Sequence, residues 1–185
     1  MKNEKNLSIK EAFNLAVQCH QNNNLQDAQN YYQEVLKIDP NFADAHNNLG
    51  NIFKELKDYQ KAKSCYEKVI AINPNYADAH YNFGILLKEL GENQKAKSCY
   101  EKTIEIDPNY TKAHNNLGIV FQELGELQKA KECYEKAIEI DPLNKKSQAA
   151  YGGILIILND KLKGYEYLQK GQGVIKFTPS NYKII

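Results

Sequence analysis

Arginine is absent from this chain, because all 24 basic residues are lysines. The planar fork of arginine is the side chain most used for bidentate contacts to phosphates and guanine edges. The formal net charge is only +1, so no strong field draws the chain toward nucleic acid or an anionic membrane. We therefore expect a protein that binds neither nucleic acid nor a membrane surface.

Long apolar segments are missing as well. The longest uninterrupted apolar run, Ile154–Leu158, is far shorter than the roughly 18 residues of a membrane-spanning helix. The lysine-bearing start, Met1–Ile9, is not followed by the apolar core of a secretory signal. Hydrophobic residues make up 42% and charged residues 25% of the chain, the balance of an ordinary folded protein. We expect a cytoplasmic protein.

What the sequence does contain is a repeat of 34 residues, marked by Pro40, Pro74, Pro108 and Pro142. The same period relates three further sets: Asn48, Asn82 and Asn116; Gly50, Gly84 and Gly118; Cys65, Cys99 and Cys133. Coincidence does not produce so many matches at one spacing, and a period of this length is typical of repeat architectures.

Each repeat carries two stripes with the spacing of a helix. His46, Leu49, Gly50 and Phe53 lie at i, i+3, i+4 and i+7. A turn near Lys57 and Asp58 leads to a second stripe, formed by Ala62, Tyr66, Val69 and Ile70. We predict hairpins of two helices, each about 12 to 14 residues long, which bury their apolar faces by stacking on neighbouring hairpins. Glycines at position 50 and its equivalents, and alanines at position 62 and its equivalents, favour close crossing of the two helices.

The repeat resembles the tetratricopeptide repeat in its period and in residues Leu49-Gly50, Phe53, Ala62, Tyr66 and Pro74. It departs from that pattern where the family's tryptophan is replaced by His46, His80 and His114. The resemblance implies an all-α, right-handed superhelical solenoid of antiparallel helix-turn-helix repeats. It also implies a scaffold for protein–protein interaction rather than an enzyme.

On this basis the chain divides into a flexible segment (1–8), repeats, and an arm. The four repeats span 9–42, 43–76, 77–110 and 111–144, and the first begins with a capping box of Ser8 and Glu11. Residues 145–172 read as a degenerate capping repeat in which Gly164 weakens the second helix and Gly171 and Gly173 end it early. Residues 173–185 form a non-helical arm, and the stretch from Val174 is expected to be either a short hairpin or extended.

The recurring histidines and cysteines suggest metal or disulfide chemistry at first sight. Equivalent positions of neighbouring helices lie about 8–10 Å apart, whereas zinc ligands lie about 2 Å from one metal and a disulfide needs Cα atoms within about 7 Å. We expect histidines that fill space between repeats and four reduced, mostly buried cysteines. No phosphate-binding loop and no catalytic grouping is evident, so we predict no metal, no cofactor and no catalysis.

The first helices carry an additional stripe opposite the apolar one. In the tetratricopeptide family this stripe lines the concave groove, so the resemblance implies that it faces a ligand. It contains Lys10, Asn14, Val17 and Gln21; Asp44, Asn48, Asn51 and Glu55; Asp78, Asn82, Ile85 and Glu89; and Lys112, Asn116, Ile119 and Glu123. Neighbouring side chains expected to contribute are Phe13, Asn47, Tyr81, Lys88 and Asn115.

Asn14, Asn48, Asn82 and Asn116 form a ladder with one amide in each repeat. An amide offers both a donor and an acceptor, as an extended peptide backbone requires. The ladder is similar to that of the O-linked N-acetylglucosamine transferase repeats, which implies a protein or peptide partner in extended conformation. The alternative is that the asparagines are solvated or cap adjacent repeats. The lysine, asparagine and arginine clamp for a C-terminal carboxylate is not matched, since only Lys112 survives.

Two alternatives remain at the C-terminal end. The helix around Ile154–Leu158 is apolar on nearly every side and should therefore be buried, either by the arm folding back or by a second copy, which would give a homodimer through this end. The chain is also consistent with the substrate-recruiting part of a larger enzyme, a transferase or oxygenase, whose catalytic domain lies beyond residue 185.

Overall fold

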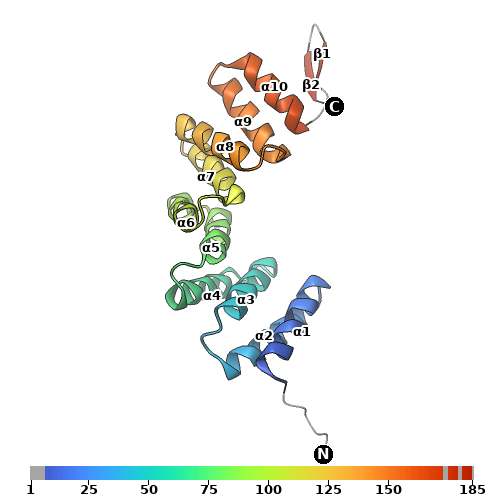
Figure 1. Ribbon diagram of the computed structural model, residues 1–185, viewed down its shortest axis with the longest axis vertical. Helices are drawn as coiled ribbons and strands as arrows, with labels where there is room; N and C mark the ends of the chain where they lie inside the picture. Colours follow the sequence, from blue (N-terminus) through green and yellow to red (C-terminus); the bar gives the residue numbers. More distant parts are fainter. Residues whose placement is uncertain (1–6, 173–174, 179–180, 185) are drawn as a thin grey trace, which may run out of the picture. The chain divides into compact units, whose positions relative to one another are not determined.

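The computed structural model describes residues 7–172, 175–178 and 181–184, with side chains up to residue 172. The described residues form helices that alternate as the first and second members of hairpins, as predicted (Figure 1). The helices are α1 (Ile9–Gln21), α2 (Leu25–Ile38), α3 (Ala43–Glu55), α4 (Tyr59–Ile72), α5 (Ala77–Glu89), α6 (Asn93–Ile106), α7 (Thr111–Glu123), α8 (Leu127–Ile140), α9 (Lys145–Ile157) and α10 (Lys161–Gln172). None of these helices is long and apolar enough to cross a bilayer.

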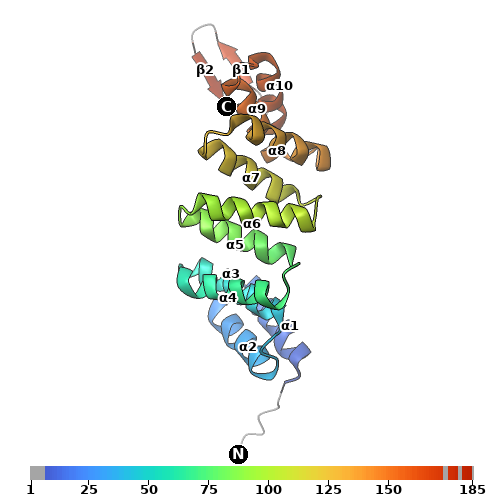
Figure 2. The same cartoon turned by 90° about the vertical axis from the view of Figure 1, so that its left-hand side faces the viewer.

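The chain forms two compact units, Met1–Leu86 and Leu87–Ile185, whose division falls inside α5. In the first unit, α1 packs on α2, α2 on α3 and α3 on α4. In the second unit, α6 to α10 pack in the same sequential way, and Figure 2 shows α7 and α8 running alongside one another. Each unit is therefore a stack of helical hairpins with its own apolar core.

The turn inside each hairpin repeats the same backbone geometry. Positive φ angles occur at Asn23 (59°), Lys57 (61°), Gly91 (75°), Gly125 (77°) and Asn159 (69°). These five residues are 34 positions apart, so the turn between the two helices needs one left-handed residue in every repeat. The side chain of the residue that follows often caps the second helix, as Asn24 and Asp58 do by accepting from the backbone N–H groups of Asp27 and Lys61.

In the second and fourth hairpins, a tyrosine of the second helix packs against a glycine of the first. Tyr66 and Tyr134 are 0% and 1% exposed. A Cβ atom on Gly50 would lie 2.6 Å from the Tyr66 ring, and one on Gly118 would lie 2.5 Å from the Tyr134 ring. The close crossing predicted from the small residues is therefore confirmed at these two positions.

The histidines close the loops between repeats. Nε2 of His46, His80 and His114 lies 2.9, 2.8 and 3.0 Å from the carbonyl oxygen of the proline six residues earlier. His80 and His114 are nearly buried, at 8% and 7% exposure. The histidines thus fix the entry to each first helix, and the described residues contain no group of three side chains arranged to hold a metal ion.

The cysteines are less buried than predicted. Cys19, Cys65, Cys99 and Cys133 are all free thiols and all partly exposed. They lie at the edge of the core rather than within it, because the tyrosine that follows each of the last three occupies the interior. Burial is still sufficient to raise the pKa of the Cys65 and Cys99 thiols to about 11 and that of Cys133 to about 12.

The second helix of the fifth hairpin has 12 residues, against 14 in α4, α6 and α8; Gly171 lies within it and does not end it, and Gly173 lies outside the described residues. The helix α10 continues through Gly171 to Gln172. A Cβ on Gly171 would lie 2.5 Å from the backbone nitrogen of Ala149, and one on Gly164 would lie 2.6 Å from Cγ1 of Ile156. These two glycines allow α10 to approach α9 closely, and they do not mark a weak or terminating helix.

One side of the apolar helix α9 is exposed in the single chain, and its cover by the arm or by a second copy stays a prediction. Ile154 and Leu155 are 1% and 2% exposed, but Ile157 is 53% exposed. Beyond α10, β1 (Ile175–Thr178) and β2 (Asn181–Ile184) form an antiparallel hairpin, with Phe177 opposite Tyr182 in the register. Of the two expected forms of the arm, the described residues adopt the hairpin.

Candidate functional site

We define the ladder face as the stripe that repeats at four positions of each first helix. In α1, α3, α5 and α7 it contains the four sets of residues predicted to face a ligand. Lys10, Asn14, Asp44, Asp78 and Lys112 are exposed, whereas Asn48, Asn51, Asn82 and Asn116 are half-buried. The ladder amides Asn48, Asn82 and Asn116 are therefore accessible only in part, whereas Asn14 is exposed.

In the first unit these contacts form a network of tyrosine hydroxyls and asparagine amides. Asn48 Nδ2 donates to the hydroxyl of Tyr32 at 3.0 Å, and the hydroxyl of Tyr66 donates to Asn51 Oδ1 at 2.8 Å. Burial is the main reason why the pKa of Tyr32 is raised, so this hydroxyl stays protonated at neutral pH. The buried tyrosines of the second helices thus fix the orientation of ladder asparagines on the next first helix and on their own.

A second link joins neighbouring first helices directly. Asn82 Nδ2 donates to Asn47 Oδ1 at 3.2 Å, and Asn47 is only 6% exposed. Asn47 Nδ2 in turn lies 3.5 Å from Asn48 Oδ1. Asn47 therefore holds the ladder residues Asn48 and Asn82 from the protein interior, because its own side chain is buried.

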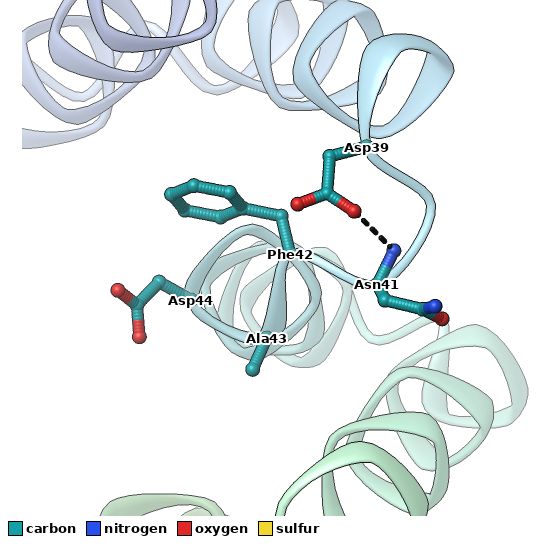
Figure 3. Close-up of a pocket in the computed structure, with 5 residues that line it drawn as sticks. All are labelled: Asp39, Asn41, Phe42, Ala43 and Asp44. Carbon is teal, nitrogen blue, oxygen red and sulfur yellow. Dashed lines mark hydrogen bonds between the residues drawn. The ribbon is translucent and has the colours of Figure 1, made fainter.

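A hollow of about 240 Å³ lies at the start of α3, lined by Asp39, Asn41, Phe42, Ala43 and Asp44 (Figure 3). The backbone N–H of Asn41 donates to Asp39 Oδ1 at 2.9 Å, which holds the loop in place. The Phe42 ring packs on Phe13, with ring centroids 5.1 Å apart. The predicted residues Phe13 and Asp44 thus contribute to one end of the ladder face of this unit.

Asp44 is also engaged from a neighbouring repeat. Its carboxylate accepts a hydrogen bond from the Tyr76 hydroxyl. Burial and this hydrogen bond both raise the pKa of Tyr76. Asp44 as a residue remains exposed, so a ligand can reach it.

The second unit repeats this network with two differences. Asn115 Nδ2 donates to Ser147 Oγ at 2.8 Å, which links α7 to α9, but the buried Asn115 Oδ1 has no partner among the described residues. Glu123 is bound by Lys88 at 2.7 Å and by Asn93 Nδ2 at 3.1 Å. Lys88, predicted to contact a ligand, is therefore occupied by an ion pair.

The ladder face continues onto α9, where sequence reasoning did not extend it. Counting on by 34 residues from Lys112, Asn116, Ile119 and Glu123 gives Lys146, Ala150, Gly153 and Ile157. Ala150 replaces the ladder asparagine there, so the asparagine pattern does not predict this continuation. The repeat register itself was a sufficient signal, because α9 has the same length and position in its hairpin as α7.

The remaining predicted residues lie on or beside the same stripes. Val17, Tyr81 and Ile85 are half-buried, and Ile119 is 37% exposed. A second hollow, of about 320 Å³, lies at the starts of α7 and α9, lined by Tyr110, Thr111, Lys112, Asp141 and Asn144. The first unit therefore offers three ladder asparagines, Asn14, Asn48 and Asn82, beside a hollow at the start of α3, and the second unit offers Asn116 beside a hollow at the starts of α7 and α9.

Comparison with known proteins agrees with this description. Family models described as "Tetratricopeptide repeat" match residues 43–76, 111–144 and 65–98, and one described as "TPR repeat" matches 18–57 and 84–125. Together they span the chain from residue 18 to residue 144. Among curated proteins, no match is found.

Solved structures show the same fold at low sequence identity. PilF of Pseudomonas aeruginosa is 22% identical with a TM-score of 0.83, covering 91% of this chain and 78% of that one. MamA of Desulfovibrio magneticus RS-1 is 24% identical with a TM-score of 0.78, covering 88% and 92%. YrrB, described as a TPR protein with an unusual peptide-binding site, is 24% identical with a TM-score of 0.72, covering 92% and 87%. Taken together with the hairpins and their period, these matches show that the chain belongs to the tetratricopeptide repeat family.

Proposed function

We propose that the ladder face binds an extended segment of another protein, so that the chain serves as an interaction scaffold. The observation that carries this proposal is the fixed orientation of the ladder amides. One N–H of the Asn48 amide donates to the Tyr32 hydroxyl, and one N–H of the Asn82 amide donates to Asn47 Oδ1. Oriented amides on successive helices recognise main-chain groups at regular intervals without selecting a particular side chain.

Pre-organisation supports this function energetically. A side chain that the protein already holds in place loses little conformational entropy when a ligand binds. Buried tyrosines hold Asn48 and Asn51, so these amides are ordered before binding. YrrB, a TPR protein of similar fold, has a peptide-binding site, which supports such a role.

The test is affinity capture from a native lysate with two matched triple variants. Asn48→Ala/Asn82→Ala/Asn116→Ala removes the ladder, and Gln33→Ala/Gln60→Ala/Gln128→Ala removes exposed amides from second helices. Each lost hydrogen bond weakens binding by about 0.5–1.5 kcal/mol. The affinity of the ladder variant for its partners should therefore fall about tenfold or more. Partners retained equally by both variants, with unchanged helicity, would refute recognition through the ladder face.

A further inference from the structure

Gly153 is unusual among the helical glycines of the second unit. Added Cβ atoms on Gly118, Gly152, Gly164 and Gly171 would all come within 3.0 Å of neighbouring atoms. A Cβ on Gly153 would meet nothing within 4 Å. Residues 87–172 of this unit are all described, and in them Gly153 is the helical glycine that no packing contact explains.

Glycine inside a helix is unfavourable relative to alanine by about 0.8–1 kcal/mol. Gly153 lies in the interior of α9, and its φ angle is not positive, so no turn requires it. It occupies the ladder-face position that holds Asn51 in α3 and Ile119 in α7. The consequence of glycine at this position is an open space on the ladder face.

The residues around this space are apolar. Ala150 precedes Gly153 on the same stripe, and Ile157 follows it with 53% of its surface exposed. Ile119 occupies the equivalent position of α7 and is 37% exposed. The two helices are joined where Asn115 Nδ2 of α7 donates to Ser147 Oγ of α9 at 2.8 Å.

The residues that begin the ladder face in α7 and α9 are both lysines. Lys112 and Lys146 begin the ladder face of α7 and α9, both are exposed, and neither forms an ion pair within the part of the chain that the structure describes. The nearest acidic member of the stripe, Glu123, is already bound by Lys88. The Asp141 carboxylate lines the hollow beside Lys112 but makes no ion pair with it. Two unpaired cations therefore border an apolar space.

We propose that the space over Gly153, between Ile119 and Ile157, accepts a bulky apolar side chain of the bound segment, and that Lys112 and Lys146 bind an acidic residue of the same segment. The proposal rests on the proposed function and names the kind of segment that binds. Gly153 and Lys146 are separated by two helical turns, about 10 Å. An extended chain covers this distance in about three residues.

Short fluorescein-labelled peptides of serine and glycine test this arrangement. The first carries a central Phe with Glu at the third position on either side; the second replaces Phe with Ala, and the third replaces both Glu with Lys. Fluorescence anisotropy with the full chain should show the first peptide binding about tenfold more tightly than either of the others. Equal affinity for the first and second peptides would refute the apolar site, as would no binding of the first peptide up to about 1 mM.

Two variants locate the binding. Gly153→Leu fills the space and should weaken binding of the first peptide about tenfold or more, while thermal unfolding is unchanged or raised because a Cβ atom at this position meets nothing within 4 Å and leucine favours a helix more than glycine does. Lys112→Glu/Lys146→Glu should shift the preference from the first peptide to the third. Affinity of Gly153→Leu within about twofold of wild type would overturn the proposal.

The asparagine variant and Gly153→Leu together distinguish failure of this proposal from failure of the proposed function. If the asparagine variant loses its captured partners and Gly153→Leu does not, ladder-face binding stands and the apolar site is refuted. If both variants keep them, both proposals are refuted. Self-association of the wild type that Gly153→Leu abolishes would assign the space to a second copy and refute a peptide ligand there.

Discussion

At the scale of single residues, the asparagine network breaks at one position. Asn47 Oδ1 accepts from Asn82, which is 35 residues later. The residue 35 positions after Asn115 is Ala150, which has no side-chain donor, and Asn115 Oδ1 is buried without a partner among the described residues. A buried acceptor without a partner destabilises the fold by about 1–3 kcal/mol.

Restoring the missing donor should stabilise the second unit. We expect Ala150→Asn to raise the free energy of unfolding by about 1 kcal/mol, measured by urea denaturation. Lys146→Asn is the control, because it introduces asparagine on the same helix with no acceptor beside it and reports the cost in helix propensity. The interpretation is wrong if Ala150→Asn is no more stable than the control.

Two glycines on the first helices of the second unit should respond in opposite ways to the same substitution. Gly118→Ala places a methyl group about where the Tyr134 ring lies and should lower the free energy of unfolding by about 1–3 kcal/mol. Gly153→Ala meets no neighbour and should raise it by up to about 1 kcal/mol. Thermal unfolding of the two variants decides the matter, and a change of the same sign in both would contradict the packing described here.

At the scale of helices, equivalent helices differ in whether a side chain caps the backbone N–H groups of their first turn. Asp58 caps α4 by accepting from the backbone N–H of Lys61. Glu126 occupies the same position before α8 and makes no such bond. Its hydrogen bond and ion pair with Lys129 lower the pKa of Glu126, but an exposed pair of this kind contributes little to stability.

Shortening this side chain should improve the cap. We expect Glu126→Asp to raise the free energy of unfolding by about 0.5–1 kcal/mol, because aspartate reaches the N–H groups of the first turn and glutamate does not. Circular dichroism during thermal unfolding measures the change. Glu132→Asp, exposed within α8, serves as the control and should show no gain; an equal gain in both would show that the gain does not come from capping.

The sequence predicted the hairpins well because their signal is local. The spacing of Leu49 and Phe53, and the proline at the end of each repeat, depend on neighbours within a few residues. Gly171 was misread because a glycine that ends a helix and a glycine that permits close packing look alike until the partner helix is placed. The sequence likewise does not predict that Ile157 is exposed in the single chain, since apolar composition does not reveal which face of a helix is covered.

At the scale of the whole molecule, the partly buried thiols make stability depend on alkaline pH. Ordinary thiols ionise near pH 9, whereas the folded protein holds the protons of Cys65 and Cys99 to about pH 11 and that of Cys133 to about pH 12. Between these limits the folded chain binds more protons than the unfolded chain. Its stability is therefore at its full value below pH 9 and falls as the pH rises.

Removing the three thiols should flatten this dependence. The free energy of unfolding of Cys65→Ala/Cys99→Ala/Cys133→Ala should fall less steeply than that of wild type between about pH 9 and pH 11, as measured by urea denaturation at each pH. Buried tyrosines such as Tyr134, whose pKa burial raises to about 12, account for the slope that remains. Parallel curves for the two proteins would show that the thiols do not contribute.

The candidate site was predicted in outline and not in its contacts. Helical spacing is enough to place Asn14, Asn48 and Asn82 on one stripe. It does not show that Tyr32 holds Asn48 or that Asn47 is covered, because those bonds join helices that are distant in sequence. The continuation of the stripe onto Gly153 lacked the asparagine that made the earlier repeats recognisable.

The junctions between repeats are equivalent, and this equivalence affects how the number of repeats can change during evolution. Every loop that leads to a new first helix is closed by a side chain bound to the proline carbonyl six residues earlier: His46, His80, His114 and, in the last repeat, Gln148. Duplication or loss of one 34-residue segment of the gene would therefore join chemically equivalent ends and preserve these bonds. Recombination between the repeats can change the number of hairpins in a descendant, and with it the length of segment bound, without requiring any new contact to evolve.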